Sequence, residues 1–167
     1  GVLSMPSGQI ATPGFQWKTF AQSWPVPATG HAHELDFVLS GTLLDGRFGN
    51  NGWMQELPDP VSKVAWDNAA MMSKSTAEGL GVDSERLLRV STSSAQITIP
   101  VRVMIGIAEG TIVLPMGHGS DPLYGGRVGG GVGVQVNRLQ SAASPAVAVA
   151  TLVDTVRATG MTTEVAE

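Results

Sequence analysis

The chain has 167 residues, with 10 lysine and arginine residues against 14 aspartate and glutamate residues, a net charge of −4, and no cysteine. The basic residues are scattered singly, which argues against a nucleic-acid-binding surface. The lack of cysteine excludes disulfides, thiolate zinc sites and an iron–sulfur cluster ligated by this chain. Apolar runs such as residues 146–153 are far shorter than the roughly 20 residues that span a bilayer. We therefore expect one domain, with no membrane span and no signal-peptide pattern at its start.

Residues 1–33 contain four prolines and irregularly placed apolar residues, which indicates an extended arm or covering segment. Within it, His31 and His33 are two apart and could reach a metal together with Glu34 or Asp36. No motif places a third ligand beside them, so surface histidines are the simpler interpretation. No metal site is predicted.

The first clear strand pattern is ELDFVLSGTLL at residues 34–44. Leu35, Phe37 and Leu39 alternate with other residues, as they do in a strand with one buried face. This strand opens the predicted domain, which extends from residue 34 to residue 155.

Residues 50–68, NNGWMQELPDPVSKVAWDN, have too many helix breakers for a helix and no sustained alternation for a strand. Glu56 and Asp59 could form an acid/base pair, but an aspartate between two prolines is typical of a turn. We expect Trp66 to lie in a strand and in the core, and Trp53 to lie in a loop on a covering or contact surface. The stretch is predicted to be a connector.

Residues 68–82 carry the best helix signal, with Ser75 and Glu78 in a capping-box arrangement and Gly81 at the position of a left-handed C-terminal cap. We expect one or two short helices in all. The remaining polar residues, 156–167, form a tail that we expect to fray.

From residue 86 onward the sequence is rich in β-branched residues, in short runs separated by turn residues. The predicted strands are RLLRVSTS, QITIPVRVMI, GTIVLPMG, GVGVQVNRLQ and PAVAVATLV. Together with residues 34–44 they make six strands. A small closed barrel is favoured over a sandwich, because only closure removes the edges of so short a sheet.

Residues 117–133, GHGSDPLYGGRVGGGVG, are rich in glycine and contain Arg127. Such a segment can wrap backbone amides around a phosphate while an arginine supplies a bidentate partner. The alternative is a long hairpin without a ligand, since the spacing matches neither the Walker loop nor the Rossmann fingerprint. His118 lies in this segment without a neighbouring nucleophile or acid at defined spacing, so it carries little catalytic information.

The order of STAEGLGV, LLRVSTS, IPVRV and GTIVLPMG resembles the C-terminal dinucleotide-binding domain of the molybdopterin oxidoreductase superfamily. The resemblance covers residues 34–155. The stretches DGRFGNNGWMQELPDPVSKVAWDNAAMMS and GRVGGGVGVQVN are closest to the molybdopterin-oxidoreductase-like B subunit of bacterial alternative complex III. The implied fold is a mainly β, six-stranded double-psi β-barrel of the aspartate-decarboxylase-like type.

This resemblance also implies a cofactor, molybdopterin guanine dinucleotide. Its contacts would be Gly117, His118, Gly119, Arg127 and Asn137, with no catalytic residue and no metal ligand in this chain. One departure is that the alternative complex III B subunit is a relative thought to lack a molybdenum cofactor. Asn137 also has a simpler interpretation, as a strand-end side chain that bonds local backbone. The implied partners are other domains or subunits of a membrane-associated respiratory complex on its periplasmic side.

Two functions therefore stay open. The chain is either a cofactor-binding domain of a respiratory oxidoreductase or complex subunit, inactive in isolation, or a structural module of an electron-transfer complex that binds no cofactor. A free-standing decarboxylase-type enzyme would need a self-cleaving pair, and Gly119 and Ser120 have no supporting acid. Domains of this kind expose apolar patches and can form homo-oligomers through them.

Overall fold

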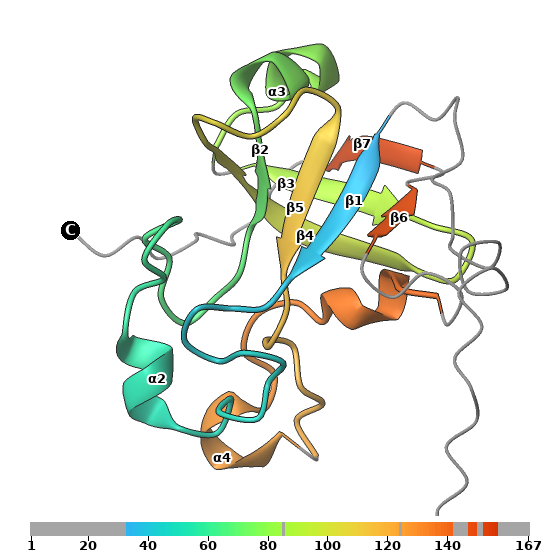
Figure 1. Cartoon of the computed structure of the whole chain (residues 1–167). Helices are drawn as coiled ribbons and strands as arrows, with labels where there is room; N and C mark the ends of the chain where they lie inside the picture. Colours follow the sequence, from blue (N-terminus) through green and yellow to red (C-terminus); the bar gives the residue numbers. More distant parts are fainter. Residues whose placement is uncertain (1–32, 85, 124, 142–146, 150–151, 157–167) are drawn as a thin grey trace, which may run out of the picture.

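The computed structural model describes residues 33–84, 86–123, 125–141, 147–149 and 152–156 (Figure 1). Except for His33 and Val156, the residues of the predicted N-terminal arm, 1–33, and of the predicted polar tail, 156–167, lie outside these ranges, and so does His31. No helix among them is both long and apolar enough to cross a membrane.

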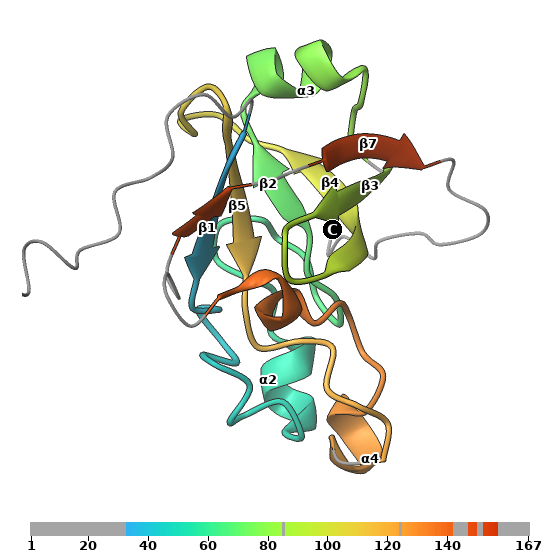
Figure 2. The ribbon, with the colours of Figure 1, turned by 90° about the vertical axis from the view of Figure 1, so that its right-hand side faces the viewer.

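The described strands form one mixed sheet in the order β6-β1-β5-β2-β4-β3-β7. The pairs β1–β5 and β2–β4 are parallel, and the other pairs are antiparallel. The strands are β1 (Glu34–Val38), β2 (Ala70–Met72), β3 (Leu87–Ser91), β4 (Gln96–Val103), β5 (Thr111–Pro115), β6 (Val147–Val149) and β7 (Leu152–Val156). The prediction of a mainly β domain is confirmed. Figures 1 and 2 show the sheet with the short helix α3 (Lys74–Leu80) at one end and the helices α2 (Gly52–Glu56) and α4 (Gly126–Gly129) at the other.

The prediction of a closed six-stranded barrel is wrong for the described residues, because β6 and β7 end the sheet without pairing to each other. One predicted strand is missing. Residues 131–140 instead form turns and a 3-10 helix, η1 (Val136–Leu139). Gly131 and Gly133 have φ values of 76° and 68°, and such left-handed residues interrupt an extended strand.

The core lies between the strands, where their apolar side chains meet those of α3 and η1. Leu35 and Phe37 are buried as predicted, but Leu39 is 58% exposed because β1 ends at Val38. Ser40 then closes a turn, since its Oγ accepts a hydrogen bond from the Leu43 amide. The largest fully buried side chains are Leu35, Leu43, Met72, Leu88, Ile99, Ile112, Leu114, Leu139, Val90 and Val136.

The segment that gave the best helix signal contains both a strand and a helix. The strand β2 occupies its first part, with all three residues buried between β4 and β5. The helix α3 then begins after Ser73, whose side chain accepts a hydrogen bond from the Thr76 amide. The predicted N-cap Ser75 is therefore wrong by two positions. Gly81 does adopt the left-handed conformation, with φ 66°, so the predicted C-cap is confirmed.

Residues 50–68 contain the helix α2, which the sequence analysis did not predict. Asn51 caps it by accepting a hydrogen bond from the Trp53 amide. Trp53 is 87% exposed, which confirms its place on the surface, but it lies in α2 and not in the predicted loop. The prediction for Trp66 is wrong: it lies outside any strand with φ 56°, is half-buried, and donates from its indole nitrogen to Glu56 at 2.7 Å.

Asp59 has the turn role that the flanking prolines suggest. Its Oδ1 atom accepts hydrogen bonds from the amides of Val61 and Ser62, at 2.9 and 2.7 Å. Glu56 is engaged elsewhere, with the indole of Trp66. The two carboxylates therefore hold local structure separately, as the simpler interpretation predicted.

Candidate functional site

Two chain segments far apart in sequence pack against each other beyond one end of the sheet (Figures 1 and 2). We call this region the loop lobe, made of residues 41–69 and 117–134. The side chain of Asn50 joins its two halves, because its Oδ1 atom accepts a hydrogen bond from the Val128 amide at 2.9 Å. The lobe brings the glycine-rich segment beside the tryptophan-rich connector.

Asn68 is the main polar link inside the loop lobe. It is 3% exposed and follows the connector just before β2. Its Nδ2 atom donates to the carbonyl oxygens of Pro115 and Val134, both at 2.9 Å, and its Oδ1 atom accepts from the Val134 amide at 2.8 Å. One side chain thus satisfies three backbone groups that come from the end of β5 and from the glycine-rich segment.

The glycines of this segment are needed for close packing of the chain on itself. A Cβ atom on Gly119 would lie 2.0 Å from the Gln135 nitrogen, and one on Gly129 would lie 2.2 Å from the Gly49 oxygen. Gly119 also has φ 76°, which side-chain-bearing residues rarely adopt. Its amide donates to the Val132 carbonyl at 2.7 Å. Close backbone approach, which the sequence suggested for a phosphate, is here used between the loops themselves.

A cavity of about 430 Å³ opens between this segment and the start of β4. Its lining combines polar and apolar residues and includes one cation, Arg138, and one anion, Asp121. Its lining residues are Gln96, Ile97, Thr98, Gly119, Ser120, Asp121, Pro122, Gly131, Gly133, Val134, Gln135 and Arg138. A cavity of this size and polarity suits part of a nucleotide-like ligand.

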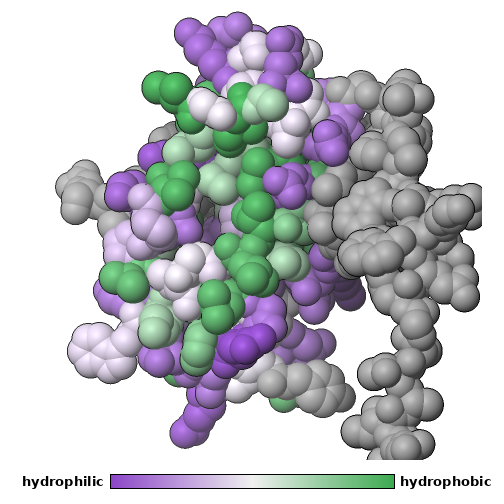
Figure 3. Space-filling view, viewed as in Figure 1, coloured by the Kyte–Doolittle hydropathy of each residue, from purple (hydrophilic) through white to green (hydrophobic). Residues whose placement is uncertain are grey.

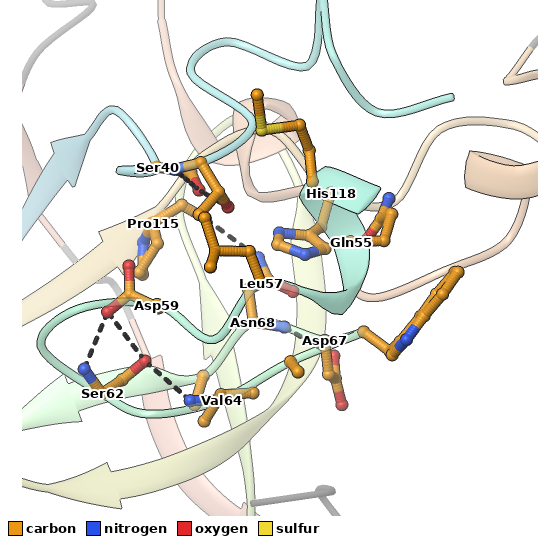
Figure 4. A pocket seen from close by; sticks show the side chains of 15 residues that line it. Ser40, Gln55, Leu57, Asp59, Ser62, Val64, Asp67, Asn68, Pro115 and His118 are labelled. Atoms are coloured by element: carbon orange, nitrogen blue, oxygen red, sulfur yellow. Dashed lines mark hydrogen bonds between the residues drawn. The ribbon is translucent and has the colours of Figure 1, made fainter. Parts of the chain in front are cut away.

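A second, narrower cleft lies in the loop lobe (Figure 4). Its volume is only about 10 Å³, which is room for about one water molecule. His118 lines this cleft, and burial lowers its pKa to about 4, against the opposing effect of the Asp59 charge. Burial also raises the pKa of Asp67 on the same cleft, with an opposing hydrogen bond from the Asn68 amide. The cleft is a poor environment for charge.

Two atoms of this cleft are buried without a hydrogen-bond partner, Gln55 Oε1 and His118 Nδ1. Gln55 is 2% exposed, and its Nε2 atom donates to the Gly49 carbonyl at 2.8 Å. That bond fixes which end of the amide is which, because only the nitrogen can donate to a carbonyl. The oxygen is therefore the end without a partner.

The five predicted cofactor contacts do not meet at one place. Gly119 lines the larger cavity and His118 lines the narrow cleft. Gly117 is buried, and a Cβ atom there would lie 2.9 Å from the Leu44 oxygen. Arg127 on α4 and Asn137 on η1 are exposed and line neither hollow. The cofactor-binding role of these residues stays a prediction.

The residue that the sequence analysis missed is Arg138, the cation of the larger cavity. The family resemblance points to Asn137, and in the strand predicted over residues 131–140 the neighbouring Arg138 would face the opposite side. Gln96 and Thr98 at the start of β4 did indicate a polar face on this strand, since alternate residues of a strand share a face. The sequence contained no signal for the burial of Gln55, because an isolated glutamine in a connector is ordinarily exposed.

No group of three or more metal-ligating side chains occurs among the residues that the structure describes. His33 lies just before β1, and burial lowers its pKa. A metal bound by this part of the chain alone is therefore not supported.

Comparison with known proteins gives a family match and similar solved structures. Residues 47–155 match the family described as molydopterin dinucleotide binding domain. The structure is similar to that of acetylene hydratase from Pelobacter acetylenicus, with a TM-score of 0.50 and 19% sequence identity, over 66% of this chain and 15% of that chain. A search of curated proteins found no match. Because the family match extends over well more than half of the sequence, the chain belongs to the molydopterin dinucleotide binding domain family.

Proposed function

We propose that this chain acts as the cofactor-holding domain of a larger oxidoreductase and is not catalytic in isolation. The observation that carries the proposal is the 430 Å³ cavity, which the glycine-rich segment builds together with Arg138 inside the region that matches the family. The chain spans only 15% of the length of acetylene hydratase, so the activity of any longer protein belongs to the proposal as well.

The residues of the cavity fit the phosphate and nucleotide end of a molybdopterin dinucleotide. Arg138 offers a planar guanidinium for a phosphate, and Thr98 and Ser120 offer hydroxyl groups. Asp121 lies on the same lining and would suit a donor group of the base or ribose. When bound, the cofactor supplies the redox chemistry at its metal, while this chain binds and orients it.

The finer assignment rests on the resemblance to the B subunit of alternative complex III. The stretches that carry this resemblance include α2, β2 and α4. The helices α2 and α4 belong to the loop lobe, and β2 follows it directly in the chain. We propose that the chain serves a respiratory electron-transfer complex in a membrane-associated, periplasmic setting, beside other domains or subunits.

A second candidate function is a structural module that binds no cofactor. Several amides in and next to the glycine-rich segment already donate hydrogen bonds within the chain, including those of Gly119, Gly131 and Val134. These amides are not free to bind a phosphate, which favours the structural module. It is also favoured by exposed apolar side chains: hydrophobic residues gather over β2, β5 and the loops beyond them (Figure 3). The large exposed apolar residues are Leu39, Phe48, Trp53, Leu57, Val61, Ile105 and Leu123.

The two functions separate in a thermal-shift titration of the purified chain with guanosine diphosphate and with a molybdopterin extract. A ligand that binds only the folded state raises the melting temperature. We expect a rise that Arg138→Ala abolishes and that the matched variant Arg86→Ala retains, because Arg138 lines the cavity whereas the exposed Arg86 pairs with Asp83 away from it. Equal loss in both variants would contradict the proposed site. No rise with either ligand, in folded protein, would favour the structural module.

A further inference from the structure

The connector contains an exposed asparagine that is followed by a glycine, Asn51 before Gly52. The side-chain amide of an asparagine can react with the backbone nitrogen of the next residue. A glycine in that place leaves the nitrogen accessible and the backbone free to turn. The other asparagines of the chain each precede a residue that carries a side chain: Asn50, Asn68 and Asn137. Asn51 is therefore the asparagine at which such a reaction meets the least steric hindrance.

The structure leaves both reacting groups of this pair accessible. Asn51 is exposed in the turn before α2, and the Gly52 amide has no hydrogen-bond partner among the residues that the structure describes. The Oδ1 atom of Asn51 accepts a hydrogen bond from the Trp53 amide at 3.1 Å. This bond polarises the side-chain carbonyl and can stabilise the negative charge that develops on its oxygen when the Gly52 nitrogen adds to Cγ.

The backbone at Asn51 has to rotate before these two atoms meet. The residue is extended, with ψ 108°, so the Gly52 nitrogen points away from the side-chain Cγ atom. The rotation opens the first turn of α2, which is only five residues long. Because a helix this short is marginal by itself, its first turn opens more readily than the strands of the core. The reaction therefore needs local opening and no unfolding of the domain.

We propose that Asn51 is a site of spontaneous deamidation. The Gly52 nitrogen bonds to Cγ, its proton passes through water to the side-chain nitrogen, and ammonia leaves, which gives a five-membered succinimide ring. Water then opens the ring. Attack at Cγ gives aspartate, whereas attack at the backbone carbonyl carbon gives isoaspartate, in which the main chain runs through the side chain and is one carbon longer. Water is the only co-reactant, and no atom is oxidised or reduced.

The position of this site makes the modification relevant to the loop lobe. Asn50, the preceding residue, accepts the hydrogen bond from the Val128 amide that joins the two halves of the lobe. Both products add a carboxylate next to this bond. Isoaspartate also lengthens the backbone between Asn50 and α2, and so moves the Asn50 side chain relative to the helix. The contact between α2 and α4 should therefore loosen as the protein ages.

The test is incubation of the full chain under mildly alkaline conditions, followed by peptide mass spectrometry that separates aspartate from isoaspartate. We expect Asn51 to lose ammonia several times faster than Asn137, which is also exposed but precedes an arginine, and we expect both products at position 51. A rate at Asn51 no higher than the rate at Asn137 would overturn the proposal.

The variant Gly52→Ala tests the role of the backbone nitrogen. A Cβ atom on Gly52 would meet Val128 Cγ1 at 3.8 Å, which is ordinary contact, so the variant fits the fold. It should slow the reaction at Asn51 by about fivefold, because alanine lacks the backbone freedom of glycine. An unchanged rate would contradict ring closure through this nitrogen.

The variant Asn51→Ser tests the effect on the loop lobe. Serine keeps an oxygen that can cap α2 but has no amide to lose. After incubation, the Val128 amide of the wild type should exchange with solvent faster than in fresh protein, as hydrogen exchange followed by NMR can measure. The exchange in Asn51→Ser should stay unchanged by the same incubation. An equal increase in both proteins would refute the link between Asn51 and the join of the lobe.

Discussion

Replacing Asn68 with alanine should be among the most damaging single changes in the loop lobe. The variant loses three hydrogen bonds, to the Pro115 carbonyl and to both backbone groups of Val134. Each such bond contributes about 1 kcal/mol net, so we expect a loss of about 3 kcal/mol in the free energy of unfolding. For a chain of this length that corresponds to a fall of about 6–12 °C in melting temperature.

The assay is urea unfolding followed by far-ultraviolet circular dichroism, with Asn137→Ala as the matched control. Asn137 is exposed on η1, so its replacement should change stability by less than about 0.5 kcal/mol. A loss below about 1 kcal/mol in Asn68→Ala would refute the argument that these bonds hold the lobe together.

Asn68→Asp gives a second, pH-dependent check on the same bonds. It keeps an acceptor for the Val134 amide but sets a carboxylate against the carbonyls of Pro115 and Val134. The folded state should therefore raise the pKa of this carboxyl above its unfolded value, and hence bind more protons. The variant should gain stability, relative to wild type at each pH, as the pH falls from 7 toward 4. A constant difference across that range would contradict the geometry.

Three further predictions concern single residues. Gly119→Ala should destabilise the chain by more than about 2 kcal/mol or prevent folding, because the added carbon would overlap the backbone of Gln135. Gly79→Ala in α3, where the added carbon has nothing within 4 Å, should stabilise the chain by about 0.5–1 kcal/mol in the same assay. Ser73→Ala should cost about 1 kcal/mol as a lost N-cap, and Ser75→Ala should cost clearly less, which circular dichroism melts can rank. The pKa of His118 should be about 4 in an NMR titration. Because the unfolded chain then binds a proton more readily than the folded one, this residue should make the fold less stable as the pH falls from about 6.5 toward 4. A ring that titrates near 6.5 would contradict its burial.

The sequence by itself determined the features that depend on neighbouring residues. The alternation of Leu35 and Phe37 predicted a buried strand face, and Gly81 predicted the helix end, because local geometry allows few alternatives at these positions. The aspartate between two prolines predicted its turn for the same reason. The family resemblance likewise came from the order of motifs along the chain, and the match over residues 47–155 bears it out at the level of the superfamily.

Only the tertiary structure decided which residues share a site. Residues 70–72 are a strand because β4 and β5 bury them on both sides, a contact that helix propensity cannot register. Left-handed glycines turned the expected strand at 131–140 into η1, which brought Arg138 to the cavity and left Asn137 exposed. Gln55 and His118 are 63 positions apart and meet only because the two halves of the loop lobe fold together. Such long-range contacts depend on the packing of the whole domain, which no short stretch of sequence specifies.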